Sequence, residues 1–344
     1  MNARNKTLAF ILGTSTLFIG ACHTDNTKNN GQTSADTTHT KTVVTSTIPT
    51  FNADSAYKFT KTQVDFGPRI PGSVAHEKTL NYIVSNLKAD SLQVTIQRSS
   101  AKTFDGKTFP FQNITASFDP SNQARIVFFT HWDTRPWADL DSVEPTKPFD
   151  GADDGASGVA VLLELARDLR KSNPGIGIDL VFVDLEDYGQ QSDEDSKYPK
   201  MKDSWCLGSQ YWAQNLPSGY SPRFGILLDM VGGKNPLFPM EGTSTIYAQS
   251  IIDKVWNVAA ELGYGSYFST QTTGPTTDDH LYINKIAHIP TIDIVHYDVD
   301  RGDYPYFHHR HSDNMSVIDP ATMQIVGNVL LKVIFSEKNS TQHS

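Results

Sequence analysis

Four short runs of mainly apolar residues constrain the fold of this chain most strongly. They are Ile126–Thr130, Ile178–Val183, Phe224–Leu228 and Thr291–Val295. Runs of this length and composition are typical of strands that are buried on both faces of a sheet. The segment Ser157–Leu169 lies between the first two runs and repeats apolar residues on one helical face. Buried strands that alternate with helices predict a mostly parallel sheet.

The remaining periodicity predicts the other elements of an α/β domain over residues 51–338. Hydrophobic residues make up 38% of the chain, which is enough for a large core. We expect a single three-layer domain, with a mixed, mostly parallel sheet and helices on both faces. The further expected helices are Asp54–Thr62, Ser73–Leu87, Leu207–Asn215, Ile251–Leu262 and Pro320–Phe335, and the further expected strands are Ser91–Arg98 and Phe111–Phe118.

The first 22 residues are typical of a segment that directs export. Arg4 and Lys6 precede a short apolar run that ends in Ile19-Gly20-Ala21-Cys22, and small residues before a cysteine resemble the lipobox of bacterial lipoproteins. We therefore expect a lipoprotein signal peptide at 1–22 with lipidation of Cys22, the alternative being an ordinary signal peptide. The polar segment 23–50 is expected to be a disordered tether, and 339–344 a flexible tail. These features predict an exported bacterial lipoprotein, periplasmic and membrane-anchored.

Composition excludes several classes of partner and fold. The formal net charge is −9 and no basic run is present, which argues against nucleic acid as a partner. Two cysteines cannot form a disulfide framework. No apolar stretch is long enough for a membrane-spanning helix, so we expect membrane contact only through the lipid anchor.

Acidic residues and histidines follow every predicted buried strand. In chain order they are His131 and Asp133, then Asp184, Glu186 and Asp187, then Asp229, and finally His296, His308, His309 and His311, with Asp153 and Asp154 before the helix at 157. Taken singly, each has an ordinary explanation, such as a helix cap at Asp153 or Asp154. Together they would crowd uncompensated charge at the carboxyl edge of the sheet, where ligands bind in open α/β folds. Aspartate, glutamate and histidine in this combination predict a zinc site.

At these residues the chain resembles the zinc aminopeptidase superfamily and, within it, the zinc-dependent glutaminyl cyclase lipoproteins of Bacteroidetes. The segments that carry the resemblance are Phe66-Gly-Pro-Arg-Ile-Pro-Gly-Ser73, Thr130-His-Trp-Asp-Thr-Arg135, Gly151-Ala-Asp-Asp-Gly155, Asp184-Leu-Glu-Asp-Tyr188, Ser204-Trp-Cys-Leu-Gly-Ser-Gln210, Leu228-Asp-Met230, Thr277-Asp-Asp-His280 and His309 with Asp313-Asn314. They span most of 51–338 in the order that the family shows.

The resemblance implies a role for each of these residues. Asp154, Asp187 and His309 correspond to the metal ligands, with His308 and His311 as competing candidates for the histidine. Glu186 corresponds to the general acid/base, Asp278 to its proton-sharing partner and Asp229 to a further member of that network. Trp205 corresponds to a tryptophan of the substrate pocket. The resemblance also implies a cis peptide bond between Asp154 and Gly155.

Two positions depart from the family pattern. Asp187 stands where the aminopeptidases and the animal cyclases have glutamate, and this shorter side chain requires a shift of backbone or a different coordination. His308 stands where a tryptophan usually precedes the ligand histidine.

The expected activity is that of a glutaminyl-peptide cyclotransferase, an acyltransferase that converts N-terminal glutamine of peptides and proteins to pyroglutamate and releases ammonia. One zinc ion per chain would act as Lewis acid and Glu186 as general acid/base. A two-zinc aminopeptidase is the main alternative, because His131, Asp154, Asp187, Asp229 and His309 could together hold two metals. A surface lipoprotein that binds peptides without catalysis is a third possibility.

Overall fold

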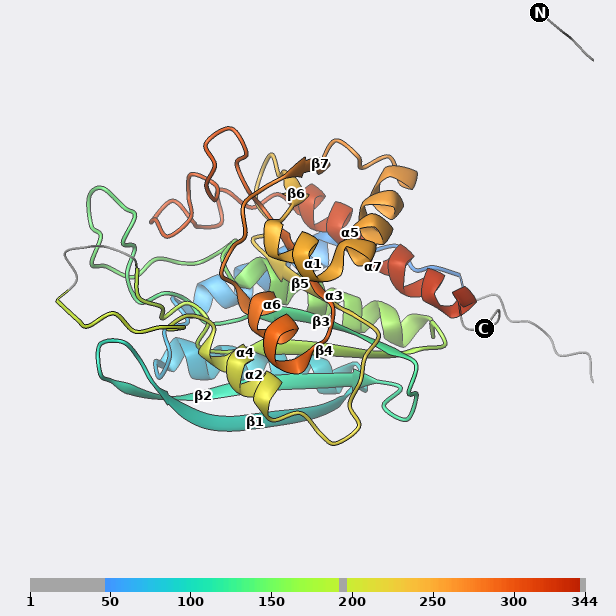
Figure 1. The fold of residues 1–344 in the computed structure, drawn as a ribbon, viewed down its shortest axis with the longest axis horizontal. Helices are drawn as coiled ribbons and strands as arrows, with labels where there is room; N and C mark the ends of the chain where they lie inside the picture. The colour runs from blue at the N-terminus through green and yellow to red at the C-terminus, as the bar shows by residue number, and fades with distance from the viewer. Residues whose placement is uncertain (1–46, 192–196, 341–344) are drawn as a thin grey trace, which may run out of the picture. The chain divides into compact units, whose positions relative to one another are not determined.

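A six-stranded mixed sheet forms the centre of the structure, a computed structural model that describes residues 47–191 and 197–340 (Figure 1). Its strand order is β1-β2-β4-β3-β5-β8. The strands β4, β3, β5 and β8 run parallel, whereas β1 and β2 form an antiparallel pair at one edge. The strand bounds are β1 Gln93–Lys102, β2 Thr108–Phe118, β3 Arg125–His131, β4 Gly177–Val183, β5 Gly225–Asp229 and β8 Thr291–Val295.

Helices cover both faces of this sheet. The larger hydrophobic cluster joins one face to α1 (Ala53–Phe66), α2 (Val74–Ala89), α3 (Ala156–Lys171), α5 (Gly242–Glu261) and α7 (Pro320–Ser340). The other face packs against α4 (Leu207–Gln214) and the π-helical turn η1 (Ile283–Ala287), which continues the short helix α6 (Asp279–Tyr282). The predicted single α/β domain with three layers is therefore confirmed.

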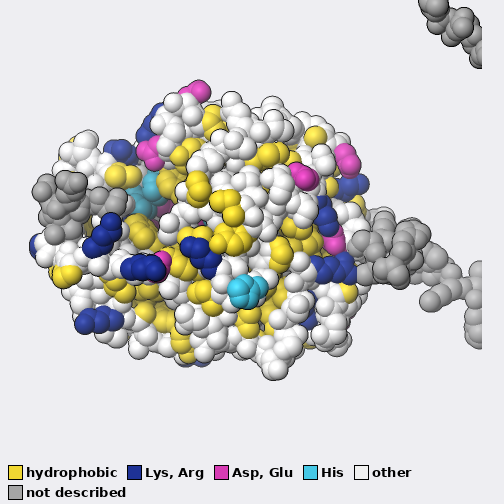
Figure 2. All heavy atoms as spheres, in the orientation of Figure 1, with side chains coloured by type: hydrophobic (Ala, Val, Ile, Leu, Met, Phe, Trp, Pro, Cys, Tyr) yellow, Lys and Arg dark blue, Asp and Glu magenta, His cyan; other side chains and the backbone are white. Residues whose placement is uncertain are grey.

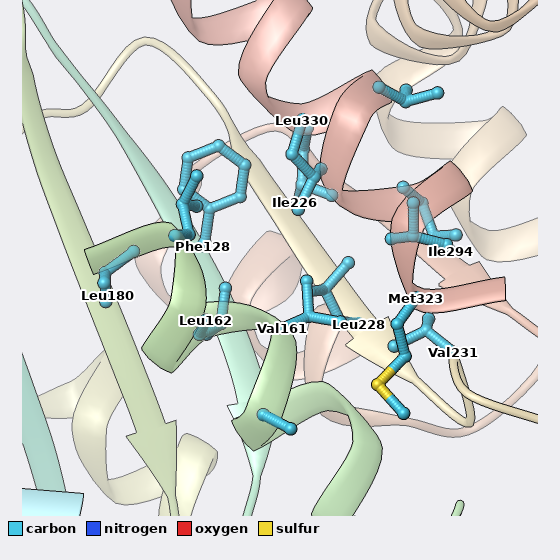
Figure 3. Packing of buried hydrophobic residues seen from close by; sticks show 14 of the residues in the cluster. Phe128, Val161, Leu162, Leu180, Ile226, Leu228, Val231, Ile294, Met323 and Leu330 are labelled. Atoms are coloured by element: carbon cyan, nitrogen blue, oxygen red, sulfur yellow. The ribbon is translucent and has the colours of Figure 1, made fainter. Parts of the chain in front are cut away.

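Successive residues of β3 show how the strands serve both layers. Phe128 faces the larger cluster and lies with Leu162 of α3 and Leu180 of β4 (Figure 3). Val127 and Phe129 face the opposite way, toward the α4 layer. All seven residues of the strand are buried, as the continuous apolar run predicts.

The structure extends several predicted elements and adds others. α5 begins at Gly242, nine residues before the predicted start, and α7 continues to Ser340, so that two residues of the predicted C-terminal tail are helical. The sequence did not predict α6, η1 or the small parallel pair β6 (Phe238–Met240) and β7 (Phe268–Thr272). These elements are too short to show a clear periodicity.

Residues 1–46, 192–196 and 341–344 lie outside the described part of the structure. The predicted signal peptide, Cys22 and most of the predicted tether fall within the first of these ranges. Among the described residues, no helix has the length and apolar character that a membrane span requires.

Candidate active site

The parallel strands deliver polar side chains to one edge of the sheet. β3 ends at His131 and β5 at Asp229, and the segment directly after β4 supplies Glu186 and Asp187. The turn before α3 supplies Asp154. Since the carboxyl ends of parallel strands share one edge, these residues meet in space although they are far apart in the sequence.

A pocket of about 430 Å³ opens at this edge, a volume within the range of small-ligand sites. Figure 2 shows histidine side chains gathered in a recess beside acidic and hydrophobic side chains. The seven residues that the sequence predicts for metal binding, catalysis and substrate binding all line the pocket: Asp154, Glu186, Asp187, Trp205, Asp229, Asp278 and His309. The structure therefore brings the complete predicted set together.

The three predicted metal ligands face one another. Nε2 of His309 lies 3.0 Å from Oδ1 of Asp187 and 3.6 Å from Oδ2 of Asp154. Oδ1 of Asp187 is buried and accepts no hydrogen bond from the described residues. Carboxylate oxygens and an imidazole nitrogen that converge in this way form a donor set that suits zinc.

The other nitrogen of His309 faces a second carboxylate. Nδ1 lies 3.4 Å from Oδ1 of Asp139, whose Oδ2 accepts hydrogen bonds of 2.9 and 2.6 Å from Arg135. A carboxylate behind a histidine ligand fixes the ring orientation and makes the facing nitrogen a better donor to metal. The surroundings of His309 therefore fit a metal ligand.

Electrostatics point to a missing positive charge at the three side chains. Burial opposes protonation of His309, but Asp187, Asp139 and Asp154 outweigh it and raise the pKa of His309 to about 9. Burial also raises the pKa of Asp187. A divalent cation among these groups would supply the positive charge that a proton on His309 otherwise provides.

A second group of candidate ligands adjoins the first. Nε2 of His131 lies 3.1 Å from Oδ1 of Asp154 and 3.4 Å from Oδ1 of Asp229. Asp154 thus stands between His131 on one side and His309 on the other. The five residues required for the two-metal alternative are all present, and their arrangement places Asp154 as the shared ligand.

The competing histidines differ in position. His311 is turned outward, with Nε2 3.1 Å from the carbonyl of Glu144. His308 stacks on His309 with ring centroids 3.8 Å apart, and its Nε2 lies 4.0 Å from Oδ2 of Asp154. His309 is therefore the histidine that contacts both predicted carboxylate ligands.

Glu186 lies beside the ligand group in a buried acidic environment. Its Oε1 accepts a hydrogen bond of 3.3 Å from the thiol of Cys206. Polar atoms of Glu186, Cys206 and Asp278 lie within 4.8 Å of one another. Burial raises the pKa of Glu186 well above its usual value, and the charges of Asp187 and Asp278 add to this against the opposing effect of His131. A carboxyl group with a raised pKa next to a second carboxyl group suits proton transfer near neutral pH.

Asp278 and Asp229 complete this acidic group. One oxygen of Asp278 accepts a hydrogen bond of 2.5 Å from the amide of Asp279, whereas Oδ2 makes none within the described residues. Burial and the charge of Asp278 raise the pKa of Asp229 to about 7, although a hydrogen bond with His131 acts against this. The two groups can therefore share protons with their neighbours near neutral pH.

Trp205 forms one wall of the pocket. Its ring lies nearly parallel to that of His309, with centroids 6.2 Å apart, and the Arg135 guanidinium lies 4.8 Å from the ring centroid. The indole nitrogen donates a hydrogen bond of 3.1 Å to the carbonyl of Gln190. A Cβ on Gly189 would lie 1.8 Å from the indole, so the tryptophan requires glycine at that position.

Several residues that support the site were not predicted. Asp133 accepts hydrogen bonds from the amides of Glu186 and Asp187 at 3.0 and 3.2 Å. Asp313 does the same for the amides of Asp153 and Asp154 at 2.8 and 3.2 Å. Both supporting aspartates lie in segments that carry the family resemblance, but a side-chain bond to a distant amide leaves no periodic signal in a sequence.

Tyr304 is a further pocket residue that the sequence did not reveal. It lines the pocket, and its ring packs against His308 with centroids 4.6 Å apart. Burial raises the pKa of its hydroxyl well above the usual value, and Asp278 and Asp229 add to the effect. The hydroxyl thus remains a neutral hydrogen-bond donor at the pocket wall.

The predicted cis peptide bond between Asp154 and Gly155 is wrong, because no described peptide bond is cis. Gly155 instead adopts φ 86°, and this left-handed conformation turns the chain into α3. A Cβ at Gly155 would lie 2.9 Å from the carbonyl oxygen of Asp133, so the glycine also permits a close approach to the site.

Residues 113–334 match the model of peptidase family M28. The chain belongs to this family. Among solved structures, it is similar to a glutaminyl cyclase of Bacteroides thetaiotaomicron, with 45% identity, coverage of 84% of this chain and 99% of that one, and a TM-score of 0.81. A zinc-dependent exopeptidase of Parabacteroides distasonis is 44% identical with the same coverage and TM-score. A glutaminyl-peptide cyclotransferase of Drosophila melanogaster is 26% identical over 282 residues, 74% of this chain and 73% of that one.

These similarities confirm the family to which the sequence pointed. Solved relatives with bacterial glutaminyl cyclase names cover nearly their whole length in this chain, and curated glutaminyl-peptide cyclotransferases of animals match about three quarters of it. Membership of the family, together with the facing carboxylates and histidine, supports zinc as the metal.

Proposed function

We propose that the chain is a zinc-dependent glutaminyl-peptide cyclotransferase that converts N-terminal glutamine to pyroglutamate and releases ammonia. One observation carries the proposal: Glu186 and Asp278 lie beside a complete aspartate–aspartate–histidine ligand group in one pocket. Similarity to bacterial glutaminyl cyclases over most of the chain supports the same activity.

In this proposal Asp154, Asp187 and His309 hold one zinc ion. When bound, zinc would supply Lewis-acid polarisation of the γ-carbonyl of the substrate glutamine. The chain holds its ligands ready, because Arg135 fixes Asp187 by its amide and Asp139 by its guanidinium. Ligands that are held in place by hydrogen bonds lose less freedom on binding.

The reaction closes a ring within one residue of the substrate. The α-amino nitrogen forms a bond to the γ-carbonyl carbon, and the bond from that carbon to the amide nitrogen breaks. Because both groups belong to the same residue, ring closure benefits from a high effective concentration. The protein must orient the side chain and move one proton.

Glu186 carries that proton. As a carboxylate it accepts a proton from the α-amine during attack, and as an acid it returns the proton to the departing nitrogen, which leaves as ammonia. Asp278 lies close enough to share the proton with Glu186, and Asp229 extends this group. Trp205 covers one side of the pocket and limits the access of water.

A two-zinc aminopeptidase remains the alternative function. His131, Asp154 and Asp229 offer ligand atoms that lie within 4.8 Å of one another, and one similar structure is named an exopeptidase. The many relatives named glutaminyl cyclases make this alternative the weaker one.

A paired peptide assay distinguishes the two reactions. The chain is incubated with a glutamine-initiated peptide and with the same peptide beginning in leucine, and ammonia, peptide mass and free amino acid are followed. A cyclase produces ammonia and a peptide about 17 Da lighter from the first and leaves the second intact, because leucine has no amide to react. Release of free leucine at a comparable rate would establish an aminopeptidase instead.

We also propose that the chain is exported and anchored to a membrane by a lipid on Cys22. The basic and apolar residues before Cys22 and the polar segment after it support this proposal. Metabolic labelling with a fatty-acid analogue, compared between the natural chain and Cys22→Ser, tests it. Unchanged labelling in the variant would refute lipidation at this cysteine.

A further inference from the structure

Glu241 is a buried carboxylate outside the pocket that makes an unusual number of hydrogen bonds. It lies at the N-terminus of α5 and is 1% exposed. Its two oxygens accept bonds of 2.7 Å from the amides of Thr243, Ser244 and Thr276, and of 2.8 Å from the hydroxyl of Ser244. Nε2 of His280 lies 2.9 Å away and completes five contacts. A buried charge is tolerated when its oxygens are satisfied in this way.

The contacts of Glu241 fall into two groups. Thr243 and Ser244 belong to the first turn of α5, where a carboxylate also interacts favourably with the helix dipole. Thr276 and His280 belong to a separate segment, which leads into α6. Although burial opposes ionisation, these bonds lower the pKa of Glu241 to about 2, so the charge persists at all physiological pH values. Glu241 therefore joins the start of α5 to the segment 276–280.

The same junction is reinforced by close backbone packing. The hydroxyl of Thr243 donates a bond of 3.0 Å to the carbonyl of Thr276. A Cβ on Gly242 would lie 2.5 Å from the backbone nitrogen of Pro275, so the helix start and the segment touch directly. The segment cannot shift without breaking these contacts.

The anchored segment carries Asp278 into the active site. Thr276 and Asp278 line the pocket, and Asp278 lies between the two residues that contact Glu241, Thr276 and His280. Polar atoms of Asp278, His280 and Asp293 lie within 4.8 Å of one another, and Nδ1 of His280 lies 3.9 Å from Oδ2 of Asp293. Glu241 and His280 thus stand directly behind the carboxylate that partners Glu186.

We propose that Glu241, with His280, is a positioning residue that holds Asp278 at the distance from Glu186 that proton sharing requires. The proposal rests on the proposed function, because it assigns Asp278 a part in proton transfer. Glu241 does not touch the pocket, so its influence on the reaction passes through the segment 276–280.

A double-mutant cycle tests this dependence. Glu241→Gln, Asp278→Asn and the double variant are compared with the natural chain in kcat on a glutamine-initiated peptide. An amide at position 241 offers only one acceptor oxygen and presents donors to the donors around it, so we expect kcat to fall by about tenfold or more. In the Asp278→Asn background the same substitution should change kcat by less than about twofold, because the residue through which Glu241 acts is already impaired.

Two comparisons separate positioning from a general loss of stability. Glu164→Gln removes another fully buried carboxylate, on α3, whose partners are Arg167 and Lys171; it should lower the melting temperature but leave kcat unchanged. His280→Gln is the second variant, and it supports the proposal if kcat falls only when Asp278 is intact, even where Glu241→Gln fails to fold. Equal losses of kcat in both Asp278 backgrounds, or an unchanged kcat in Glu241→Gln, would overturn the proposal. Absence of cyclisation by the natural chain would instead refute the function on which it rests.

Discussion

The backbone amide of Arg135 donates a hydrogen bond of 2.8 Å to Oδ2 of Asp187 and leaves Oδ1 of that carboxylate facing His309. The guanidinium of the same arginine bonds the carbonyl of Asp187 at 2.9 Å and both contacts to Asp139. One buried side chain thus orients a predicted ligand and the carboxylate behind another predicted ligand. The shorter aspartate at position 187, where related enzymes have glutamate, is held by this arrangement.

Replacement of Arg135 should therefore weaken metal binding without removing a ligand. We expect Arg135→Met to lower zinc affinity by about 10- to 100-fold, as loss of outer hydrogen bonds to ligands usually does. Competition with a chelator of known affinity measures the change. Arg301→Met is the control, because Arg301 is partly exposed and bonds only Asp303. Equal affinities of the natural chain and Arg135→Met would show that the arginine does not support the ligands.

Metal content distinguishes the ligands from their neighbours. Asp154→Asn, Asp187→Asn and His309→Gln should each lose stoichiometric zinc, because each removes one of three protein donors. His131→Gln should matter less if one zinc is bound, and His311→Gln should have no effect because that side chain points away from the site. Elemental analysis of the purified variants gives the answer. Full zinc retention in His309→Gln would point to His308, whereas two zinc ions in the natural chain would favour the peptidase.

Removal of the acid/base should separate catalysis from metal binding. Glu186→Gln preserves the shape of the side chain but cannot carry a proton, so we expect kcat to fall by about 10²- to 10⁴-fold. Zinc content should stay the same, because the change lies outside the predicted ligands. Steady-state kinetics and elemental analysis on one preparation test both statements. Turnover close to that of the natural chain would assign the proton transfer to another group.

The tryptophan wall can be displaced by a single methyl group. In Gly189→Ala the new Cβ would meet the Trp205 indole at 1.8 Å, so the ring must move away from the pocket. We expect kcat/KM for glutamine peptides to fall by about tenfold or more, as misplacement of a substrate-positioning group commonly causes. Gly265→Ala is the matched control, since a Cβ there meets no atom closer than 3.9 Å. An unaltered kcat/KM in Gly189→Ala would mean that Trp205 contributes little to substrate binding.

His296 should make stability depend on pH below neutrality. Its ring lies between Phe238 and Phe307, and burial lowers its pKa to about 4 against the opposing charge of Asp298. An unfolded histidine has a pKa of about 6.5, so between about pH 6.5 and pH 4 the unfolded chain binds the extra proton. The free energy of unfolding should therefore fall as pH falls through this window, with a contribution from His296 of up to about 3 kcal/mol.

Urea unfolding from pH 7 to pH 4 in the presence of a chelator measures this dependence. His296→Asn should reduce the slope of the unfolding free energy against pH, because the ionisable ring is gone. His288→Asn serves as the control, since His288 is exposed and asparagine tolerates its left-handed conformation. Equal slopes in the natural chain and His296→Asn would contradict the assignment.

The sequence predicted the parallel strands well because burial on both faces leaves an unbroken apolar run, as in β3. It missed the first turns of α5 because Gly242 and the threonines and serine after it have no apolar periodicity, and because the helix is capped by Glu241 rather than by a usual capping residue. The cap became visible only when the structure showed its distant partners Thr276 and His280.

The candidate site shows the same division. The rule that ligands bind at strand ends was enough to group His131, Glu186 and Asp229, since each directly follows a strand. The specific roles came from the family resemblance, because spacing alone cannot distinguish a ligand from an acid/base. Arg135 and Asp139 were missed because their contacts depend on how loops fold over one another, which a local pattern does not encode.

His309 belongs to the loop that follows β8, the last strand to be synthesised, which lies at the far edge of the sheet from β1. The ligand group therefore stays incomplete until almost the whole chain has emerged and β8 has paired with β5. A shortened or still unfolded chain cannot offer the three donors together, and tight metal binding depends on such preassembly. Capture of the metal thus marks the end of folding, and a chain that crosses a membrane before it folds would acquire both metal and activity only on the far side.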